Sequence, residues 1–188
     1  QLPVPKGEIA FTYHHRTDIL PENFPAQVNS SFAENRIGFD TKLDLIAGIW
    51  VEGTSIFRNA DLGSLRNQNA LTLGIDYTFG LGSGLNLMFE KMWVGFGEKF
   101  GKYQQNIHLN ALVGTYPINI NNRISVYGIY SKKSEISSLV GNFEHQFNKI
   151  TAYLMVFHNQ SGSFSLLQNQ MGTQFNGNGF NILLIYNH

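Results

Sequence analysis

The chain has 188 residues, of which 13 are basic and 13 acidic, and its formal net charge is +0. Charged residues make up only 14% of it, against about 25% in a typical soluble domain, and no basic run suggests nucleic acid as a partner. Cysteine is absent, which excludes disulfide bonds and thiolate metal sites. No segment approaches the ~20 apolar residues of a transmembrane helix, but a closed β-barrel also satisfies its backbone hydrogen bonds in a membrane.

The first half of the chain alternates apolar and polar residues with the period of two that a strand imposes. Within the segment 36–44, for example, Ile37, Phe39 and Leu43 share one parity and the charged residues take the other. Polar stretches without periodicity separate such segments and indicate loops. We predict strands over 7–16, 36–44, 47–57 and 69–79, long loops over 17–35 and 58–68, and a tight reversal near residue 45.

The clearest alternation lies in a β-hairpin over 69–90. Before its turn, five apolar residues share one face: Leu71, Leu73, Ile75, Tyr77 and Phe79. After the turn, Leu85, Leu87 and Phe89 continue the pattern. The turn contains Gly80, Gly82 and Gly84, and glycine readily adopts the positive φ values of a tight reversal. This hairpin therefore has one apolar face and one small, polar face.

The second half repeats the arrangement. A glycine-rich loop is predicted over 94–102, and further strands are predicted over 104–116, 123–130, 138–147, 150–158 and 180–188. The connections over 131–137 and 160–179 read as loops. The whole chain thus contains about ten predicted strands and no predicted helix, and we expect one domain over 1–188.

Short and long connections alternate along the chain. Reversals near residues 45, 82, 121 and 148 are short, whereas those beginning at 17, 58, 94 and 160 are long. In an up-and-down meander this places the short turns at one end and the longer loops at the other, as in bacterial outer-membrane barrels. We therefore predict an all-β, antiparallel, up-and-down transmembrane β-barrel with short periplasmic turns, longer external loops and its apolar faces against membrane lipid.

A soluble up-and-down barrel with its apolar face inside is the alternative. Its outer face should carry many Lys and Glu side chains, which this chain lacks. Aromatic residues also gather near the predicted strand ends, where the interfacial girdles of membrane barrels lie. They are Tyr77, Phe79, Trp93, Phe96 and Tyr103. These features favour the membrane barrel.

Two stretches resemble hairpins of porin-like outer-membrane proteins of Gram-negative bacteria, including the alginate-export-like group. They are RIGFDTKLDLIAGIWVEG (36–53) and LTLGIDYTFGLGSGLNLMFE (71–90), and the ending FNILLIYN resembles a closing strand. The resemblance implies location in the bacterial outer membrane. The last residue is His188, where such barrels commonly have phenylalanine, and that group has more than ten strands. The chain is therefore also compatible with one part of a larger barrel, or with a barrel that lacks its final residues.

Three functions follow from this interpretation. The first is a narrow, porin-like channel for small solutes or ions. The second is a non-conducting barrel that serves as a membrane anchor or as a subunit of a complex with other outer-membrane or periplasmic proteins. The third is a soluble β-barrel that binds a ligand. Barrels of about eight strands are filled by side chains whereas 16 to 18 strands leave an aqueous channel, so ten strands favour a narrow or plugged interior.

No motif predicts an enzyme, a cofactor or a metal site. His14 and His15 are adjacent, so on a strand they point to opposite faces and cannot chelate one metal together. The sequence GLGSG over 80–84 precedes a strand and not a helix N-terminus, which favours a turn over a phosphate-binding loop. We expect no catalytic, cofactor-binding or metal-ligating residue.

Charged residues recur on the predicted lumen face. Counted from the short turns, five carboxylates should lie at one mid-height band, and three basic residues share or border their parity. The set is Arg36, Asp40, Lys42, Glu52, Asp76, Glu90, Arg123 and Glu144. Because an unpaired buried charge is costly, we expect ion pairs that brace the wall; a cation-preferring constriction is the alternative.

The strand over 150–158 is apolar on both faces, which is unusual between lipid and water. Three explanations are open: an apolar plug inside the barrel, contact with another protein, or local packing in a narrow interior. The candidate interface residues are Tyr153, Leu154, Met155 and Phe157.

Overall fold

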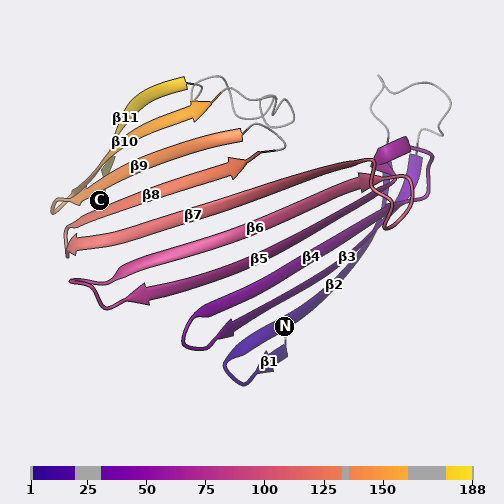
Figure 1. Cartoon of the computed structure of the whole chain (residues 1–188), viewed down its shortest axis with the longest axis horizontal. Helices are drawn as coiled ribbons and strands as arrows, with labels where there is room; N and C mark the ends of the chain where they lie inside the picture. The colour runs from indigo at the N-terminus through magenta and orange to yellow at the C-terminus, as the bar shows by residue number, and fades with distance from the viewer. Residues whose placement is uncertain (1, 20–30, 133–135, 161–176, 188) are drawn as a thin grey trace. The chain divides into compact units, whose positions relative to one another are not determined.

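The computed structural model of the chain describes residues 2–19, 31–132, 136–160 and 177–187. Its strands form one 11-stranded sheet in which neighbours follow chain order from β1 to β11 (Figure 1). The part described contains no α-helix, only a single 3-10 turn, η1 (Gly63–Leu65). No helix among these residues is long and apolar enough to cross a membrane. The prediction of an all-β, antiparallel, up-and-down sheet is confirmed.

Ten long strands correspond to the predicted ones, and the short β1 was not predicted. The strands are β1 (Leu2–Val4), β2 (Gly7–Ile19), β3 (Ser31–Asp44), β4 (Gly48–Arg58), β5 (Asn67–Phe79), β6 (Leu85–Gly97), β7 (Gln105–Asn119), β8 (Asn122–Ser131), β9 (Ile136–Gln146), β10 (Ile150–Gln160) and β11 (Gly177–Tyr186). β1 pairs with β2 through Leu2, which lies opposite Ile9.

Several strands are longer than predicted. β2 continues to Ile19 and β3 begins at Ser31, so the ends of the loop predicted over 17–35 belong to strands, and its centre lies outside the described residues. β6 continues to Gly97, so the loop predicted over 94–102 was also too long. The reason lies in Gly95 and Gly97, which do not break the strand but allow a close approach: a Cβ on Gly97 would lie 2.2 Å from the Lys102 carbonyl oxygen.

The chain divides into two compact units. Unit 1 comprises 1–74 and 92–107, and unit 2 comprises 75–91 and 108–188. The first contains β1 to β4 and the second contains β8 to β11, and β5, β6 and β7 contribute residues to each.

The register in unit 1 sorts side chains cleanly onto two faces. Across β2 and β3, Phe11 lies opposite Phe39 and Tyr13 opposite Ile37. We call this side of the sheet the apolar face and the other side the opposite face. Phe11 and Tyr13 are 70% and 68% exposed, so their hydrophobic surface is not buried in a core. Among the described residues only Phe32, Ile56 and Leu62 are buried hydrophobics.

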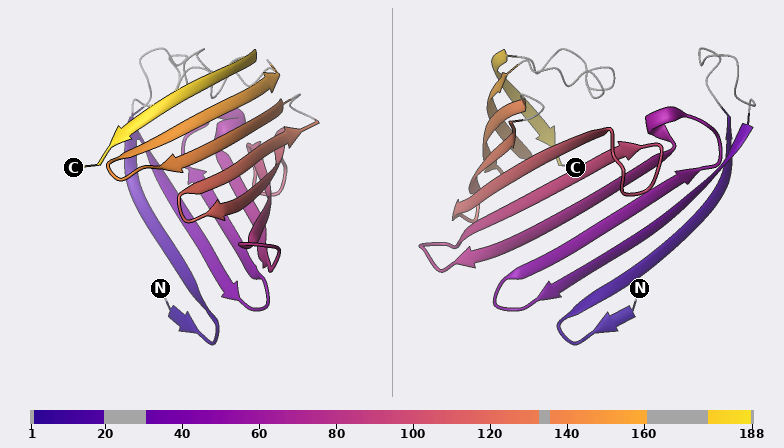
Figure 2. Two further views of the ribbon diagram at one scale, coloured as in Figure 1. Left: turned by 90° about the vertical axis from the view of Figure 1, so that its left-hand side faces the viewer. Right: turned by 45° about the vertical axis from the view of Figure 1, so that its right-hand side comes forward.

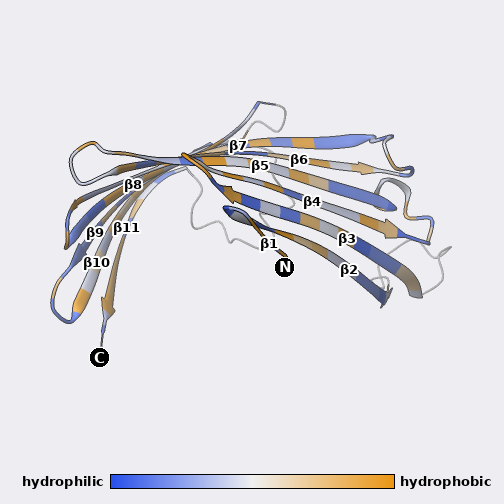
Figure 3. Cartoon of the chain, turned by 90° about the horizontal axis from the view of Figure 1, so that it is seen from below, coloured by the Kyte–Doolittle hydropathy of each residue, from blue (hydrophilic) through white to orange (hydrophobic). Residues whose placement is uncertain are grey.

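Unit 2 also has an apolar face. Phe143 lies between Ile124 of β8 and Leu154 of β10, and Leu154 lies between Phe143 and Ile182 of β11. All five of the residues Ile124, Leu139, Phe143, Leu154 and Ile182 are classed as exposed. Coloured by hydropathy, the strands alternate between apolar and polar residues along their length (Figure 3). The predicted grouping of apolar residues on one face of each strand is confirmed, and their contact with lipid stays a prediction.

The edges of the sheet are open in the part of the chain that is described. β1 pairs with β2 and β11 pairs with β10, and no ladder joins β1 to β11 in the strand order. The sheet is therefore not closed into the predicted barrel. An edge strand presents unpaired backbone N–H and C=O groups, which can pair with another strand.

The short reversals lie where the sequence predicts them (Figure 2). In the β5–β6 turn, Gly82 and Gly84 have φ values of 57° and 101°, and the Gly84 N–H donates to the Leu81 carbonyl at 3.0 Å. In the β9–β10 turn, the Phe147 N–H donates to the Ile150 carbonyl at 2.7 Å. The connections 59–66 and 98–104 are longer, as expected.

Candidate functional site

A buried carboxylate holds three arginines on the opposite face of unit 1. Glu34 of β3 lies directly opposite Arg16 of β2 and Arg58 of β4, and Arg36 follows two residues along β3 on the same face. The Glu34 side chain is 0% exposed, whereas those of Arg16, Arg36 and Arg58 are 41%, 40% and 15% exposed. We call these four residues the arginine cluster.

Every arginine of the cluster donates its Nε–H to Glu34. The Nε atoms of Arg16 and Arg36 lie 2.9 Å and 2.6 Å from Glu34 Oε1, and that of Arg58 lies 2.8 Å from Oε2. Such charge-assisted hydrogen bonds are roughly twice as strong as neutral ones. They compensate for burying the carboxylate, whose desolvation would otherwise be costly.

Two of the arginines have a further partner. Arg16 Nη2 donates to Asp18 Oδ2 at 2.6 Å, and Arg58 Nη1 donates to the Leu65 carbonyl oxygen at 2.5 Å. Within the described residues, Arg36 makes no bond besides that to Glu34. Three guanidinium groups therefore face two carboxylates, and the cluster with Asp18 keeps a surplus of positive charge.

Sequence analysis missed this cluster because it assigned residues 17–35 to a loop and ended the neighbouring strands early. Glu34 and Arg36 have the same parity, and so do Arg16 and His14 on the neighbouring strand. The strand predicted over 7–16 already ended at Arg16, and starting the strand predicted over 36–44 two residues earlier would have included Glu34. That parity was the available signal.

The eight charges predicted to share one band belong to both units. Arg36, Asp40, Lys42 and Glu52 lie in unit 1, and Asp76, Glu90, Arg123 and Glu144 lie in unit 2.

In unit 1 the basic members do not pair with the predicted carboxylates. Arg36 binds Glu34 instead, and Lys42 Nζ lies 3.9 Å from Asp44. Asp40 and Glu52 lie directly opposite one another, and neither makes an ion pair with any described residue. Since like charges placed opposite each other are destabilising, this part of the set does not brace the wall.

In unit 2 one predicted pair is present. Arg123 of β8 lies opposite Glu144 of β9, and Arg123 Nη1 is 3.6 Å from Glu144 Oε2. Asp76, in the same unit, makes no ion pair within the described part of the chain. Arg123 and Glu144 thus form one of the ion pairs that the sequence predicts, and the wider network stays a prediction.

A cavity of about 680 Å³ lies on the opposite face of β8 to β11. Asn142 lies opposite Met155, and Met155 lies opposite Asn181, so one row of residues crosses the cavity. Most of its lining is apolar, with residues that include Tyr127, Val140, Tyr153, Met155, Leu183 and Ile185. We call it the apolar cavity. The buried Oδ1 atom of Asn142 has no hydrogen-bond partner there.

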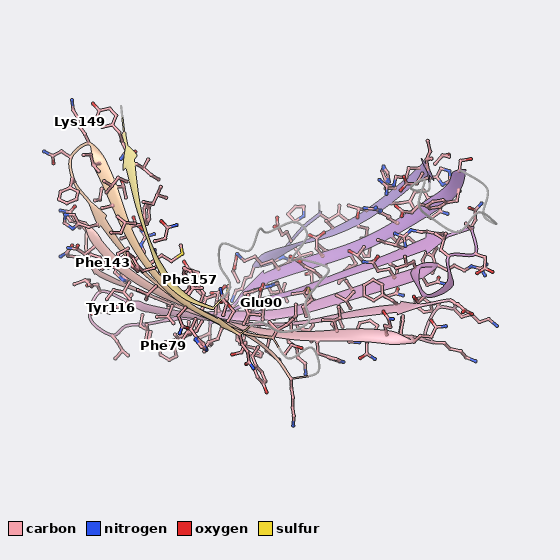
Figure 4. All side chains as sticks on the ribbon, turned by 90° about the horizontal axis from the view of Figure 1, so that it is seen from above. Phe79, Glu90, Tyr116, Phe143, Lys149 and Phe157 are labelled. Carbon is pink, nitrogen blue, oxygen red and sulfur yellow. The ribbon has the colours of Figure 1, made fainter. Side chains whose placement is uncertain are left out.

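The candidate interface residues fall on both sides of β10. Tyr153 and Met155 line the apolar cavity, and Phe157 has the same parity. Leu154 lies on the apolar face, opposite Phe143. Figure 4 shows Phe143 and Phe157 on opposite sides of the sheet. The described side chains leave the cavity open, so neither a plug nor a partner is identified, and the interface stays a prediction.

Aromatic side chains gather where β4 and β6 of unit 1 end. The connection 98–104 brings Phe100 to a ring-centroid distance of 5.9 Å from Phe57, and Tyr103 to 4.8 Å from Trp93. Trp93 lines a hollow on the apolar face together with Ile37 and Phe39. The cluster therefore belongs to the face that carries the exposed hydrophobic residues.

No protein-family model, curated protein or solved structure matches this chain. Across the described residues, no group of three or more His, Asp or Glu side chains could hold a metal ion. The arginine cluster and the apolar cavity are thus the two features whose geometry can be argued toward function.

Proposed function

We propose that the chain is an integral protein of the bacterial outer membrane, in which its strands cross the bilayer and form the wall of a barrel that passes small solutes or ions. One observation carries this proposal: a single face of the sheet collects the large hydrophobic side chains of successive strands and leaves them exposed. Soluble monomers rarely expose contiguous apolar surface on this scale. In an outer-membrane barrel this surface lies against lipid.

Strand length supports the same conclusion. β2 to β11 have between 10 residues, in β8 and β11, and 15 residues, in β7. A tilted transmembrane strand needs about 9 to 11 residues to cross the hydrocarbon region. Each long strand is therefore long enough to span a bilayer, and in the proposed barrel the longer ones would extend beyond it toward the loops.

The aromatic residues are also placed as the proposal requires. Trp93 and Tyr103 pack together near the longer connections. Tyr77 and Phe79 pack near the β5–β6 turn, with their ring centroids 4.7 Å apart. Aromatic girdles lie at both interfaces of membrane barrels. The open sheet edges would then be completed by strand pairing, either with each other or with strands outside this sequence, because lipid cannot satisfy an open edge.

A non-conducting barrel that anchors or assembles with other proteins is the second candidate. The apolar cavity favours it, since Tyr153, Met155 and Leu183 would line a water-filled passage poorly. A narrow barrel can be filled by its own side chains. In this case the wall would remain in the membrane, but no ion would pass.

Single-channel recording from the purified, refolded protein in planar bilayers distinguishes the channel from the non-conducting barrel. The channel predicts discrete conductance steps, and protein unfolded in urea is the control for nonspecific leakage. Protein that inserts into the membrane but shows no conductance would favour the non-conducting barrel that serves as an anchor or subunit. Protein that remains in the aqueous phase with lipid vesicles present would contradict both and favour the soluble ligand-binding barrel.

A further inference from the structure

We propose that the arginine cluster is a binding site for small oxyanions, such as phosphate or the phosphate or sulfate group of a small solute. The inference names the class of solute that the proposed passage would favour, and to that extent it rests on the proposed function. The binding site itself follows from the side chains of β2, β3 and β4.

Glu34 fixes the orientation of three guanidinium groups and leaves part of each unused. All three Nε atoms bind its carboxylate. Arg16 donates from one Nη atom to Asp18, and Arg58 donates from one Nη atom to the Leu65 carbonyl. One Nη atom of each remains, together with both Nη atoms of Arg36, without a partner among the described residues. Guanidinium groups held in this way suit the bidentate binding of oxyanions.

The surroundings favour an anion as well. Glu34 is 0% exposed, so an incoming ion meets guanidinium nitrogens before it meets the carboxylate. His14, which is exposed, lies directly opposite Arg36 and offers a further donor. The next carboxylate along this face of β3 is Asp40, four residues from Arg36 and therefore about 13 Å away at ~3.3 Å per residue.

A purely structural brace explains the cluster less well. One arginine balances the charge of one buried carboxylate, whereas here three guanidinium groups lie within 2.9 Å of the same carboxylate. They therefore repel one another at short range, in a place where Glu34 is removed from water. A bound anion would relieve that repulsion, because it supplies the negative charge that Glu34 and Asp18 do not.

Isothermal titration calorimetry with inorganic phosphate, on the folded protein in detergent, tests the proposal. Sodium chloride at equal ionic strength measures the nonspecific contribution. We expect phosphate to bind, and Arg36→Gln to weaken its affinity by about tenfold, the loss expected for one charge-assisted contact. Arg123→Gln is the matched control, since Arg123 also pairs with a carboxylate across two strands, and should bind phosphate as the parent does.

If Arg36→Gln does not fold, Arg36→Lys is the second variant, because it keeps the positive charge but removes the planar guanidinium group that binds an oxyanion with two nitrogens. We expect it to lower the affinity for phosphate about threefold. Phosphate that binds no more strongly than chloride would overturn the proposal, and so would equal losses in the Arg36 and Arg123 variants. If the protein binds phosphate but shows no conductance, the binding site is upheld and the proposal that the barrel passes solutes is overturned. Conductance without phosphate binding would overturn the site alone.

Discussion

The opposite face of the sheet differs between β2–β4 and β8–β11, although the apolar face is alike in both. In β2–β4 it carries a buried carboxylate ringed by arginines. In β8–β11 it carries an apolar cavity, and the Arg123–Glu144 ion pair lies elsewhere on the face. An exposed apolar face is therefore the feature that the two regions have in common. The opposite face differs from region to region, so that is where function should be sought.

The central polar groups of the two regions differ in how they are satisfied, although a buried atom without a partner also occurs in unit 1, at Asn69 Nδ2. Both carboxylate oxygens of Glu34 accept hydrogen bonds from arginine, whereas Asn142 Oδ1 is buried without a partner. A satisfied network suits a place that water and ions can reach at its rim. A buried polar atom without a partner is costly, so the Asn142 amide is a point of low stability in this region.

The largest effect should come from removing the carboxylate of the arginine cluster. We expect Glu34→Ala to lower the free energy of unfolding by about 3 to 5 kcal/mol, because three arginines lose their buried partner. Urea-induced unfolding in detergent micelles measures it. Glu144→Ala is the comparison in unit 2, where Arg123 is 56% exposed, and a loss above about 1 kcal/mol there would be unexpected. Equal losses would remove the distinction between the two regions.

A charge on the shared apolar face should cost somewhat less. Leu73→Arg places a guanidinium group at the midplane of the proposed wall, where the expected loss is about 2 to 4 kcal/mol. Thr72→Arg, on the other face of the same strand, is the control. The readout is the folded fraction after insertion into vesicles. Insertion of Leu73→Arg as efficient as that of the parent would show that the face is assigned incorrectly.

A smaller change of opposite sign is expected in the apolar cavity. Asn142→Leu removes a buried amide whose Oδ1 atom has no partner, and should raise the free energy of unfolding by about 1 kcal/mol. In a water-filled passage the same substitution would be neutral or destabilising. Asn142→Asp serves as the control and should destabilise, because it buries a charge. A stability loss in the Leu variant would mean that the cavity is wet.

Much of the fold could be predicted because it depends on parity alone. Leu71, Leu73 and Ile75 must share a face once the segment is a strand, and Gly82 and Gly84 mark a turn that only glycine adopts easily. Strand ends were harder to predict. Val94 and Phe96 lie in β6 because the backbone pairs there, and the local glycine content pointed instead to a loop.

The candidate site was less predictable than the fold. Arg16 and Glu34 lie 18 residues apart in the chain, and only the register of β2 and β3 brings them together. The size of the apolar cavity depends on how Tyr127, Tyr153 and Leu183 pack. The two-residue alternation of a strand predicts which face a side chain lies on but not how it packs there. Arg123 and Glu144 were expected in a network, and they pair because the register of β8 and β9 places them directly opposite one another.

The central claim is that the apolar face contacts lipid. Since the chain has no cysteine, single cysteines can be placed along β5 without background and spin-labelled in bilayers. Gly74 must be left unchanged, because a Cβ there would lie 1.9 Å from a Trp50 ring atom. Collision rates with oxygen, which partitions into lipid, and with a water-soluble nickel chelate then report each position. The account predicts oxygen maxima at Leu71, Leu73 and Ile75 and minima at Ala70, Thr72 and Asp76. Oxygen maxima at the even positions, or no alternation, would contradict it.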